Sequence, residues 1–426
     1  MEQILKDSGI PWIGRIPKHW NTSKIGQLYD NRYERVSDKE FEPLSVTMQG
    51  ILPQLETAAK TDDGDNRKLV RKGDFAINSR SDRRGSCGIS PKDGSVSLIN
   101  LILAPRTFMN TDYYNWLFHT TLFADEFYSW GHGIVADLWT TRWQEMKNIA
   151  IPTPPLSEQE AIAAYLDKKC GEIDELIDVE QQMIAELEAY RQSVITEAVT
   201  HGLRSDIPQK ISSIKGIDKI PTNWKEVNLL KVIYLRARLG WRGLKADEYV
   251  DEGYPFLSAF NIVNNKLIWN NLNFINQQRY DESPEIKLSL HDILIVKDGA
   301  GIGKCARVED MPLGESTANS SLGVITVSKK LYYSYLFYFF LSIPFQDNVV
   351  FLKNGMGVPH LTQENLKSVR IPLPTVEEQK DIAEYLDAKC AEIDELIKVK
   401  QEKIETLKQY RQSLIFEAVT GKHVIS

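Results

Sequence analysis

Basic side chains gather at two places in this chain of 426 residues, and their spacing suggests contact with an anionic polymer. Seven cations and two acids lie between Asn66 and Arg84, whereas five cations and no acid lie between Lys231 and Lys245. Such clusters neutralise phosphates, and arginine can also donate two hydrogen bonds to guanine. We therefore predict DNA contacts by Arg67, Lys68, Arg71, Lys72, Arg80, Arg83 and Arg84 in the first cluster and by Arg236, Arg238, Arg242 and Lys245 in the second.

The composition limits what these clusters can do. The formal net charge is -7 and the isoelectric point is about 5.7, which argues against indiscriminate binding of nucleic acid. A solvated charged face is the alternative interpretation for any single arginine. Two aromatic residues, Tyr234 and Trp241, lie within the second cluster, and we expect them to be core residues rather than base-stacking residues.

A glycine-rich stretch, 296–304, follows a predicted strand and superficially resembles a phosphate-binding loop. The pattern G-x-x-x-x-G-K-[ST] would need glycine where Asp298 stands, and Cys305 replaces the hydroxyl that would bind magnesium. We therefore predict a tight backbone turn, and we add Lys297 and Lys304 to the candidate DNA contacts. An enzyme that uses this loop is the alternative, and methylation or cleavage by the chain alone would support it.

Other patterns that carry chemistry are missing from the sequence. The histidines form no H-x-x-x-H or H-E-x-x-H pair, and the four cysteines form no C-x-x-C pair. The sequence also has neither a G-x-S-x-G motif nor the Asn/Asp-Pro-Pro-aromatic tetrapeptide of amino-group DNA methyltransferases. We predict no catalytic residue, metal or cofactor in this chain, and we expect the cysteines to be reduced core residues.

The hydrophobic pattern points away from a membrane protein. No stretch of 18 uncharged apolar residues occurs, and the first residues do not form a signal peptide. The most apolar run, 331–345, contains several tyrosines and is predicted to be a buried helical segment. We expect a cytoplasmic protein.

The chain contains an internal duplication. Residues 151–200 match residues 371–420 at about 31 of 50 positions, which signals a repeated architecture. The regions before these segments match weakly, at landmarks such as 16–20 with 220–224, 74–77 with 292–295 and 113–118 with 332–337. Similar helical segments joined to divergent domains suggest a shared scaffold that holds two modules with different targets.

Apolar residues in both repeated segments follow a heptad pattern, which predicts long helices at about 157–200 and 377–420. A helix of about 43 residues rises roughly 65 Å, close to two turns of B-DNA. We predict antiparallel packing of the two helices through Ile177, Ile184, Ile397 and Ile404, with Glu180 and Lys400 as a central ion pair. A simple coiled-coil dimerisation arm is the alternative, but such an arm would not need to occur twice.

These patterns predict a mixed α/β fold with two divergent DNA-contacting modules and an internal pseudo-two-fold repeat. The predicted segments are a first recognition domain at 1–152, a helical region at 153–205, a second recognition domain at 206–372 and a second helical region at 373–426. Each helical region begins at an IPxP element, where proline ends the preceding strand.

The start of the first long helix carries a distinctive motif. Pro154, Pro155, Leu156, Glu158 and Gln159 form PPLxEQ, and the second copy has Thr375 and Val376 but keeps Glu378 and Gln379. With this motif repeated after a second variable module, essentially the whole chain resembles the specificity subunit of a type I restriction-modification system.

The resemblance implies a non-catalytic subunit that binds double-stranded DNA at a split, asymmetric site, with one half-site for each recognition domain. It also implies that the helices set the spacing and dock two methyltransferase (modification) subunits. Methylation with S-adenosylmethionine and cleavage with ATP and Mg would then belong to the methyltransferase and the restriction/translocase subunits. One alternative is a specificity subunit of another restriction or phage-defence assembly with a fused methyltransferase-nuclease partner. Another is a coiled-coil interaction protein, whose DNA affinity would be unaffected by neutralising Arg80, Arg83 and Arg84.

Overall fold

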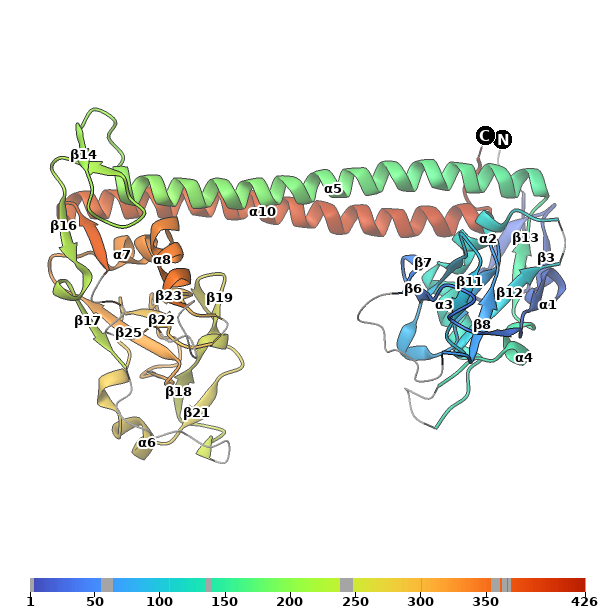
Figure 1. Ribbon diagram of the computed structural model, residues 1–426, viewed down its shortest axis with the longest axis horizontal. Coiled ribbons are helices and arrows are strands. Elements are labelled where there is room, and N and C mark those ends of the chain that lie inside the picture. Colours follow the sequence, from blue (N-terminus) through green and yellow to red (C-terminus); the bar gives the residue numbers. More distant parts are fainter. Residues whose placement is uncertain are drawn as a thin grey trace. The chain divides into compact units, whose positions relative to one another are not determined.

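The computed structural model describes residues 4–54, 64–106, 108–134, 139–237, 248–299, 301–353, 361, 366 and 369–425. The chain forms two compact units, one of residues 1–181 with 401–426 and the other of residues 182–400. Each unit contains one β-rich module and part of two long helices, α5 (Leu156–His201) and α10 (Val376–Val419). Figure 1 shows the elements of both units. The predicted division of the sequence into four segments stays a prediction.

The first module is built on a four-stranded antiparallel sheet with the order β10-β9-β12-β4, next to a three-stranded sheet with the order β11-β8-β5. Two-stranded ribbons pair β1 with β2, β6 with β7, and β3 with β13. The strands are β1 (Leu5–Asp7), β2 (Arg15–Pro17), β3 (Asn21–Lys24), β4 (Tyr29–Asn31), β5 (Arg35–Val36), β6 (Leu44–Thr47), β7 (Gly50–Pro53), β8 (Arg67–Val70), β9 (Phe75–Asn78), β10 (Cys87–Ile89), β11 (Gly94–Val96), β12 (Asn100–Pro105) and β13 (Ala150–Thr153). The helices are α1 (Ile25–Leu28), α2 (Thr111–Phe118), α3 (Thr121–Ser129) and α4 (Trp143–Met146), with a 3-10 turn, η1 (Ser81–Arg83).

The second module repeats the four-stranded sheet in the order β17-β25-β22-β23 and has a three-stranded sheet in the order β21-β18-β24. Ribbons pair β14 with β15, β16 with β26, and β19 with β20. The strands are β14 (Gln209–Ile211), β15 (Lys219–Pro221), β16 (Lys225–Asn228), β17 (Ile233–Arg236), β18 (Tyr254–Leu257), β19 (Ile262–Val263), β20 (Lys266–Leu267), β21 (Asn273–Ile275), β22 (Ile293–Val296), β23 (Cys305–Arg307), β24 (Thr317–Ala318), β25 (Leu322–Val327) and β26 (Arg370–Leu373). The helices are α6 (Gln277–Asp281), α7 (Tyr333–Leu341) and α8 (Ile343–Lys353), with 3-10 turns η3 (Leu229–Lys231), η5 (Ala259–Asn261) and η6 (Pro284–Ile286).

The strands β9 and β22 run through the centre of their modules. Every residue of both strands is buried, as expected for continuous apolar runs that are covered on two faces. Aromatic helices, α2 in the first module and α7 in the second, contact the neighbouring strands β10 and β23. The predicted burial of the apolar run 331–345 is confirmed for α7, whose residues 334–340 are all buried.

The apolar run is divided into two helices at Ser342. Pro344 has no backbone N–H to donate to the carbonyl of Phe340, so one continuous helix cannot form here. The amide Nε2 of Gln346 donates to that carbonyl instead, at 2.5 Å. No helix in the described ranges is long and apolar enough to cross a membrane.

The two long helices pack antiparallel within each unit. In the first unit Arg411 Nε lies 2.9 Å from Asp174 Oδ1, and Lys403 Nζ lies 2.6 Å from Glu180 Oε1, so residue numbers rise on α5 as they fall on α10. In the second unit the guanidinium of Arg191 lies 2.7 Å from Asp394. The predicted fold class and the packing of the helices are therefore confirmed.

The predicted seam isoleucines are shielded from solvent to different degrees. Ile177, Ile397 and Ile404 are buried, and Ile184 is half-buried. Glu180 is also buried, and its hydrogen-bonded partner is Lys403. The pairing of Glu180 with Lys400 stays a prediction.

Candidate DNA interface

The glutamates of the repeated helix-start motif fasten each module to the helix that follows it. Trp20 Nε1 donates to Glu158 Oε2 at 2.8 Å in the first unit, and Trp224 Nε1 donates to Glu378 Oε1 at 2.9 Å in the second. Both indoles are almost fully buried. A buried indole N–H needs an acceptor, so the glutamate both satisfies this donor and fixes the position of the ring.

The glutamines of the same motif hold the start of the aromatic helix in each module. Gln159 Oε1 accepts from the backbone N–H of Asn110 at 3.1 Å, and Gln379 Oε1 accepts from that of Tyr332 at 2.7 Å. Their amide groups donate to the backbone carbonyls of Pro154 and Pro374. We did not assign these roles from the sequence, although the repetition of both residues was the available signal.

One tyrosine in each module joins that module to the long helix of the other repeat. Tyr113 Oη donates to the carbonyl of Val419 in α10 at 2.8 Å, and Tyr335 Oη donates to the carbonyl of Val199 in α5 at 3.2 Å. Because Val199 and Val419 are equivalent positions of the duplication, Tyr113 and Tyr335 are equivalent as well. Each module therefore contacts the beginning of one long helix and the end of the other within its own unit.

This equivalence corrects the predicted match between the aromatic helices. The predicted alignment of 113–118 with 332–337 is wrong by three residues, because Tyr113 corresponds to Tyr335. Trp116 and Tyr338 agree with the corrected register, since they donate to the equivalent residues Asp167 and Asp387. Aromatic residues recur at helical spacing in both segments, so several different alignments match an aromatic residue with an aromatic residue.

The first two residues of the basic cluster are used inside the first module. Arg67 is 4% exposed and donates to the hydroxyl and the carbonyl of Ser95 at 2.8 and 3.0 Å. Burial lowers the pKa of Arg67. Lys68 is half-buried and donates to the carbonyl of Asn100 at 2.6 Å. Both side chains bond to acceptors inside the module, so their positions do not fit the predicted DNA contacts. Charge density in the sequence does not distinguish such internal donors from surface cations.

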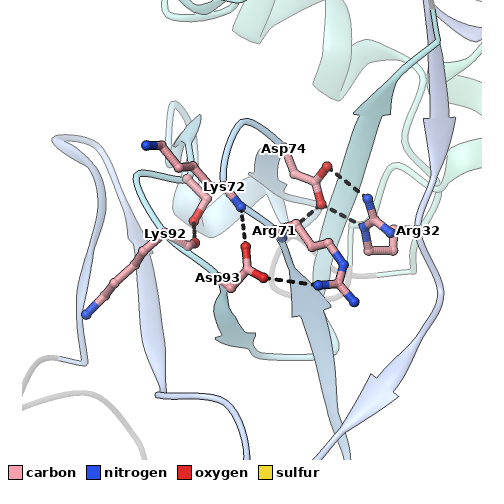
Figure 2. Close-up of polar contacts among 7 residues, drawn as sticks. Arg32, Arg71, Lys72, Asp74, Lys92 and Asp93 are labelled. Carbon is pink, nitrogen blue, oxygen red and sulfur yellow. Dashed lines mark hydrogen bonds and ion pairs between the residues drawn. The ribbon is translucent and has the colours of Figure 1, made fainter.

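Arg71 and Lys72 lie at the surface beside two carboxylates. The guanidinium of Arg71 is 3.0 Å from Asp93, and its backbone N–H donates to Asp74 (Figure 2). The backbone N–H of Lys72 donates to Asp93, while its ammonium points away from this carboxylate (Figure 2). Both side chains are exposed, so their contact with DNA stays a prediction.

Each module contains an arginine–aspartate pair with a buried carboxylate and a half-buried guanidinium. Arg32 forms two hydrogen bonds with Asp74, at 2.7 and 3.2 Å, and the guanidinium of Arg236 lies 2.6 Å from Asp292 (Figure 2 shows the first pair). Arg236 also donates to the backbone carbonyls at 285 and 287 and to Thr326. The structure therefore corrects the prediction for Arg236, which is an internal tie rather than a surface cation. The match of Asp74 with Asp292 was the sequence signal for this pair.

The remaining basic residues lie on two equivalent loops, β9–β10 at 79–86 and β22–β23 at 297–304. Arg80, Arg83 and Arg84 of the first loop are exposed, and Arg84 pairs with Asp125. In the second loop Lys304 is exposed and Lys297 is half-buried. Three further candidates, Arg238, Arg242 and Lys245, lie outside the described residues, as does Trp241.

The second loop is a tight connection between two antiparallel strands. The backbone N–H of Val296 donates to the carbonyl of Lys304 at 2.8 Å, and Gly303 adopts a φ of +88°. This confirms the predicted turn, because a phosphate-binding loop would lead from a strand into a helix. Tyr234 is 67% exposed on the edge strand β17, so the expectation of a core residue was wrong.

Cys87 and Cys305 are buried at equivalent places, at the starts of β10 and β23. Burial raises the pKa values of the Cys87 and Cys305 thiols, which keeps both protonated. In the parts of the chain that the structure describes, no group of three or more His, Cys, Asp or Glu side chains could hold a metal ion. Both modules carry exposed cations on their β9–β10 and β22–β23 loops, an arrangement that suits contact with DNA phosphates and bases.

Comparison with known proteins supplies the family. A family model described as the type I restriction modification DNA specificity domain matches residues 17–189 and 221–406. The chain belongs to this family. The two matched stretches each include most of one β-rich module and part of the long helix that follows it.

Curated relatives of this specificity-domain family match part of the chain. The MjaVIII specificity subunit of Methanocaldococcus jannaschii is 27% identical over 279 residues, covering 65% of this chain and 62% of that protein. The EcoBI specificity subunit of Escherichia coli is 24% identical over 284 residues, covering 65% and 59%. The chain thus spans about six-tenths of the length of the relatives it matches.

Solved structures show the same fold. A chain from a study of complex assembly and conformational transition in the type I restriction-modification system superposes with a TM-score of 0.74 at 16% identity, covering 96% of this chain and 99% of that one. The HsdS subunit of Thermoanaerobacter tengcongensis superposes with a TM-score of 0.53 at 19% identity, covering 96% and 98%. The two-module architecture with paired long helices is therefore the fold of specificity subunits.

Proposed function

We propose that this chain is the DNA-reading subunit of a type I restriction-modification assembly, with each module reading one half of a split DNA site. The observation that supports this most directly is the contrast within the duplication. The contacts that fasten the modules to the helices recur residue for residue, whereas the exposed loops carry different side chains. A common scaffold with two different surfaces suits an asymmetric, two-part target.

The helices would set the distance between the half-sites. α5 has 46 residues and would rise about 69 Å, which corresponds to about two turns of B-DNA. In this proposal the chain reads sequence and spacing. Methyl transfer with S-adenosylmethionine and ATP- and Mg-dependent cleavage belong to partner subunits.

A surface patch on the helices supports docking of two copies of the same methyltransferase partner. In the first unit Lys169 bonds to Glu172, and this hydrogen bond is the main cause of its raised pKa, with smaller contributions from Tyr165 and Tyr410. In the second unit the equivalent patch repeats these contacts with Lys389, Glu392, Tyr385 and Tyr190. Two patches with the same chemistry suit two identical partners.

Apolar residues extend each patch along the exposed side of the helices. Leu176 and Val179 are 47% and 50% exposed in the first unit, and Leu396 and Val399 are 45% and 52% exposed in the second. Each pair lies three residues apart, so both side chains face the same way on the helix. Exposed leucine and valine at matching positions suit a partner helix that covers them.

The methylation pattern of DNA tests the proposed function. Cells that express the chain with its methyltransferase partner should acquire methyl-adenine in both halves of one split motif, measured by methylome sequencing. Replacing residues 210–370 with another such module should change one half-site and leave the other as it was. A continuous palindromic motif would contradict the proposal.

A further inference from the structure

We infer that the β9–β10 loop of the first module recognises guanine in its half-site through an arginine contact that the equivalent β22–β23 loop of the second module cannot make. This inference rests on the proposed function and assigns a specificity-determining element within it. It depends on three features of the loops: common closing hydrogen bonds, supports on two sides of each loop, and different side chains.

The two loops share the backbone hydrogen bonds that close them. The N–H of Ser86 donates to the carbonyl of Arg83 at 3.1 Å, and the N–H of Lys304 donates to that of Gly301 at 3.0 Å. The strand end closes in the same way, because Asn78 N–H donates to Ser86 and Val296 N–H donates to Lys304. Residues of the first loop therefore correspond to residues of the second at an offset of 218.

A glycine in the left-handed region stands at the same place in both loops. Gly85 has a φ of +74° and Gly303 a φ of +88°, and each precedes the last residue of its loop. Residues with a side chain rarely adopt this backbone conformation, so both loops need glycine here to return to the strand. The shared turn makes the equivalence of the neighbouring positions unambiguous.

Both loops are held on two sides by the rest of their module. The first-loop carbonyls of Ser79 and Arg83 accept from Thr141 N–H at 3.0 Å and from the buried Tyr128 hydroxyl at 3.3 Å. The second-loop carbonyls of Lys297 and Gly303 accept from the N–H of residue 361 at 2.9 Å and from the side chain of residue 346 at 3.2 Å. Such bracing fixes the loops before a ligand arrives, which reduces the entropy lost on binding.

The side chains at equivalent positions are chemically opposed. Arg80 corresponds to Asp298, Arg83 to Gly301 and Arg84 to Ile302. The first loop thus presents three guanidinium groups where the second has a carboxylate, a hydrogen and an aliphatic chain. Among the described residues of the second loop, the one exposed cation is Lys304, whose ammonium lacks the planar, forked set of donors of an arginine guanidinium.

The side chain of Arg83 is available for contact with a base. Its side chain is 68% exposed, and its Nε lies 3.6 Å from Asp82, too far for a strong hydrogen bond. Arg84 is oriented by its contact with Asp125 and by the Tyr128 ring, whose centroid is 5.6 Å from the guanidinium carbon. Arginine recognises guanine by two parallel hydrogen bonds to O6 and N7, a pattern that glycine and isoleucine cannot make.

Selection from random DNA tests this inference. The full chain, assembled with its methyltransferase partner, is incubated with double-stranded oligonucleotides that carry a randomised segment, and the bound fraction is sequenced. Arg83→Gly introduces the residue of the equivalent second-loop position. We expect preference for one G:C pair in one half-site to fall about tenfold or more, with the other half-site unchanged.

A second variant separates base contact from charge. Arg83→Lys keeps the positive charge but loses the planar fork, so it should weaken the same guanine preference while retaining affinity for DNA of unrelated sequence. Retention of the other half-site in either variant shows that the complex has assembled and folded.

The outcomes distinguish this inference from the proposed function. If the variants bind all DNA sequences more weakly by the same factor, and their DNA affinity depends less steeply on salt concentration, Arg83 contacts a phosphate. That result would overturn the inference. An unchanged guanine preference in both variants would overturn it too. If the unsubstituted complex selects no split motif, the proposed function itself fails.

Discussion

Tyr113 and Tyr335 donate to equivalent carbonyls, Val419 and Val199, in opposite helices. The β9–β10 and β22–β23 loops of the same two modules share their closing hydrogen bonds and a left-handed glycine, yet Arg83 in one stands where Gly301 stands in the other. The attachments of the two modules are therefore alike in their side chains, whereas the two loops are alike only in how the backbone closes them.

This difference separates two kinds of constraint. A module must match the helix ends on which it rests, and those ends are nearly the same in both repeats, so the tryptophan and the tyrosine that contact them recur in both modules. Exposed loop side chains contact no such common surface and can differ without disturbing the fold. Substitutions at equivalent positions of the two modules test this separation.

The largest effect is expected at the arginine–aspartate pairs. Asp74→Ala and Asp292→Ala each leave a half-buried guanidinium without its carboxylate, which should lower the free energy of unfolding of that module by about 3 kcal/mol. Hydrogen exchange measured by mass spectrometry on the full chain should show faster exchange in β4 and β9 for the first variant and in β17 and β22 for the second.

The matched control removes both partners of the first pair. Arg32→Leu combined with Asp74→Leu should be less damaging than Asp74→Ala alone, because no buried charge is left unpaired. Faster exchange in both modules after a single substitution would show that the modules do not behave as separate structures.

A smaller effect is expected at the exposed apolar pairs on the helices. Leu176→Asp and Leu396→Asp should each weaken binding of one methyltransferase copy by about tenfold or more, because a carboxylate would be buried against an apolar partner. Native mass spectrometry should detect one bound copy for each single variant and none for the double variant. Two copies in both single variants would place the docking surface elsewhere.

The smallest effect is expected at the charged position of the helix seam. Lys403→Glu should lower the free energy of unfolding by about 1 kcal/mol, because Glu180 is buried and Lys403 is half exposed, and Glu180→Lys should restore it. The same cycle with Lys400→Glu tests the pairing predicted from the heptads. Chemical denaturation measures both cycles, and additive effects for both lysines would contradict any pairing of Glu180.

The long helices could be predicted closely from the sequence. The heptads predict helices at about 157–200 and 377–420, and the structure has them at Leu156–His201 and Val376–Val419. Helical periodicity is a local property that extends over many residues, so it needs no knowledge of distant contacts. The matches of 16–20 with 220–224 and of Cys87 with Cys305 also agree with the structure.

The candidate site could be predicted only in part. Arg67, Arg80 and Arg236 look alike in sequence, but Arg67 and Arg236 have internal acceptors and Arg80 is exposed. Their partners are distant in the chain: Ser95 lies 28 residues from Arg67, and Asp292 lies 56 residues from Arg236. Local charge density carries no information about such long-range partners.

The contacts of Tyr113 and Tyr335 also determine when each unit can be completed during synthesis. Tyr335 bonds to Val199, which lies 136 residues earlier and already exists when the tyrosine is made. Tyr113 bonds to Val419, 306 residues later, so at 5–20 residues per second it waits roughly 15–60 s for its partner. The module that leaves the ribosome first is therefore the last to be finished, and its unoccupied helix-binding surface is exposed throughout that interval.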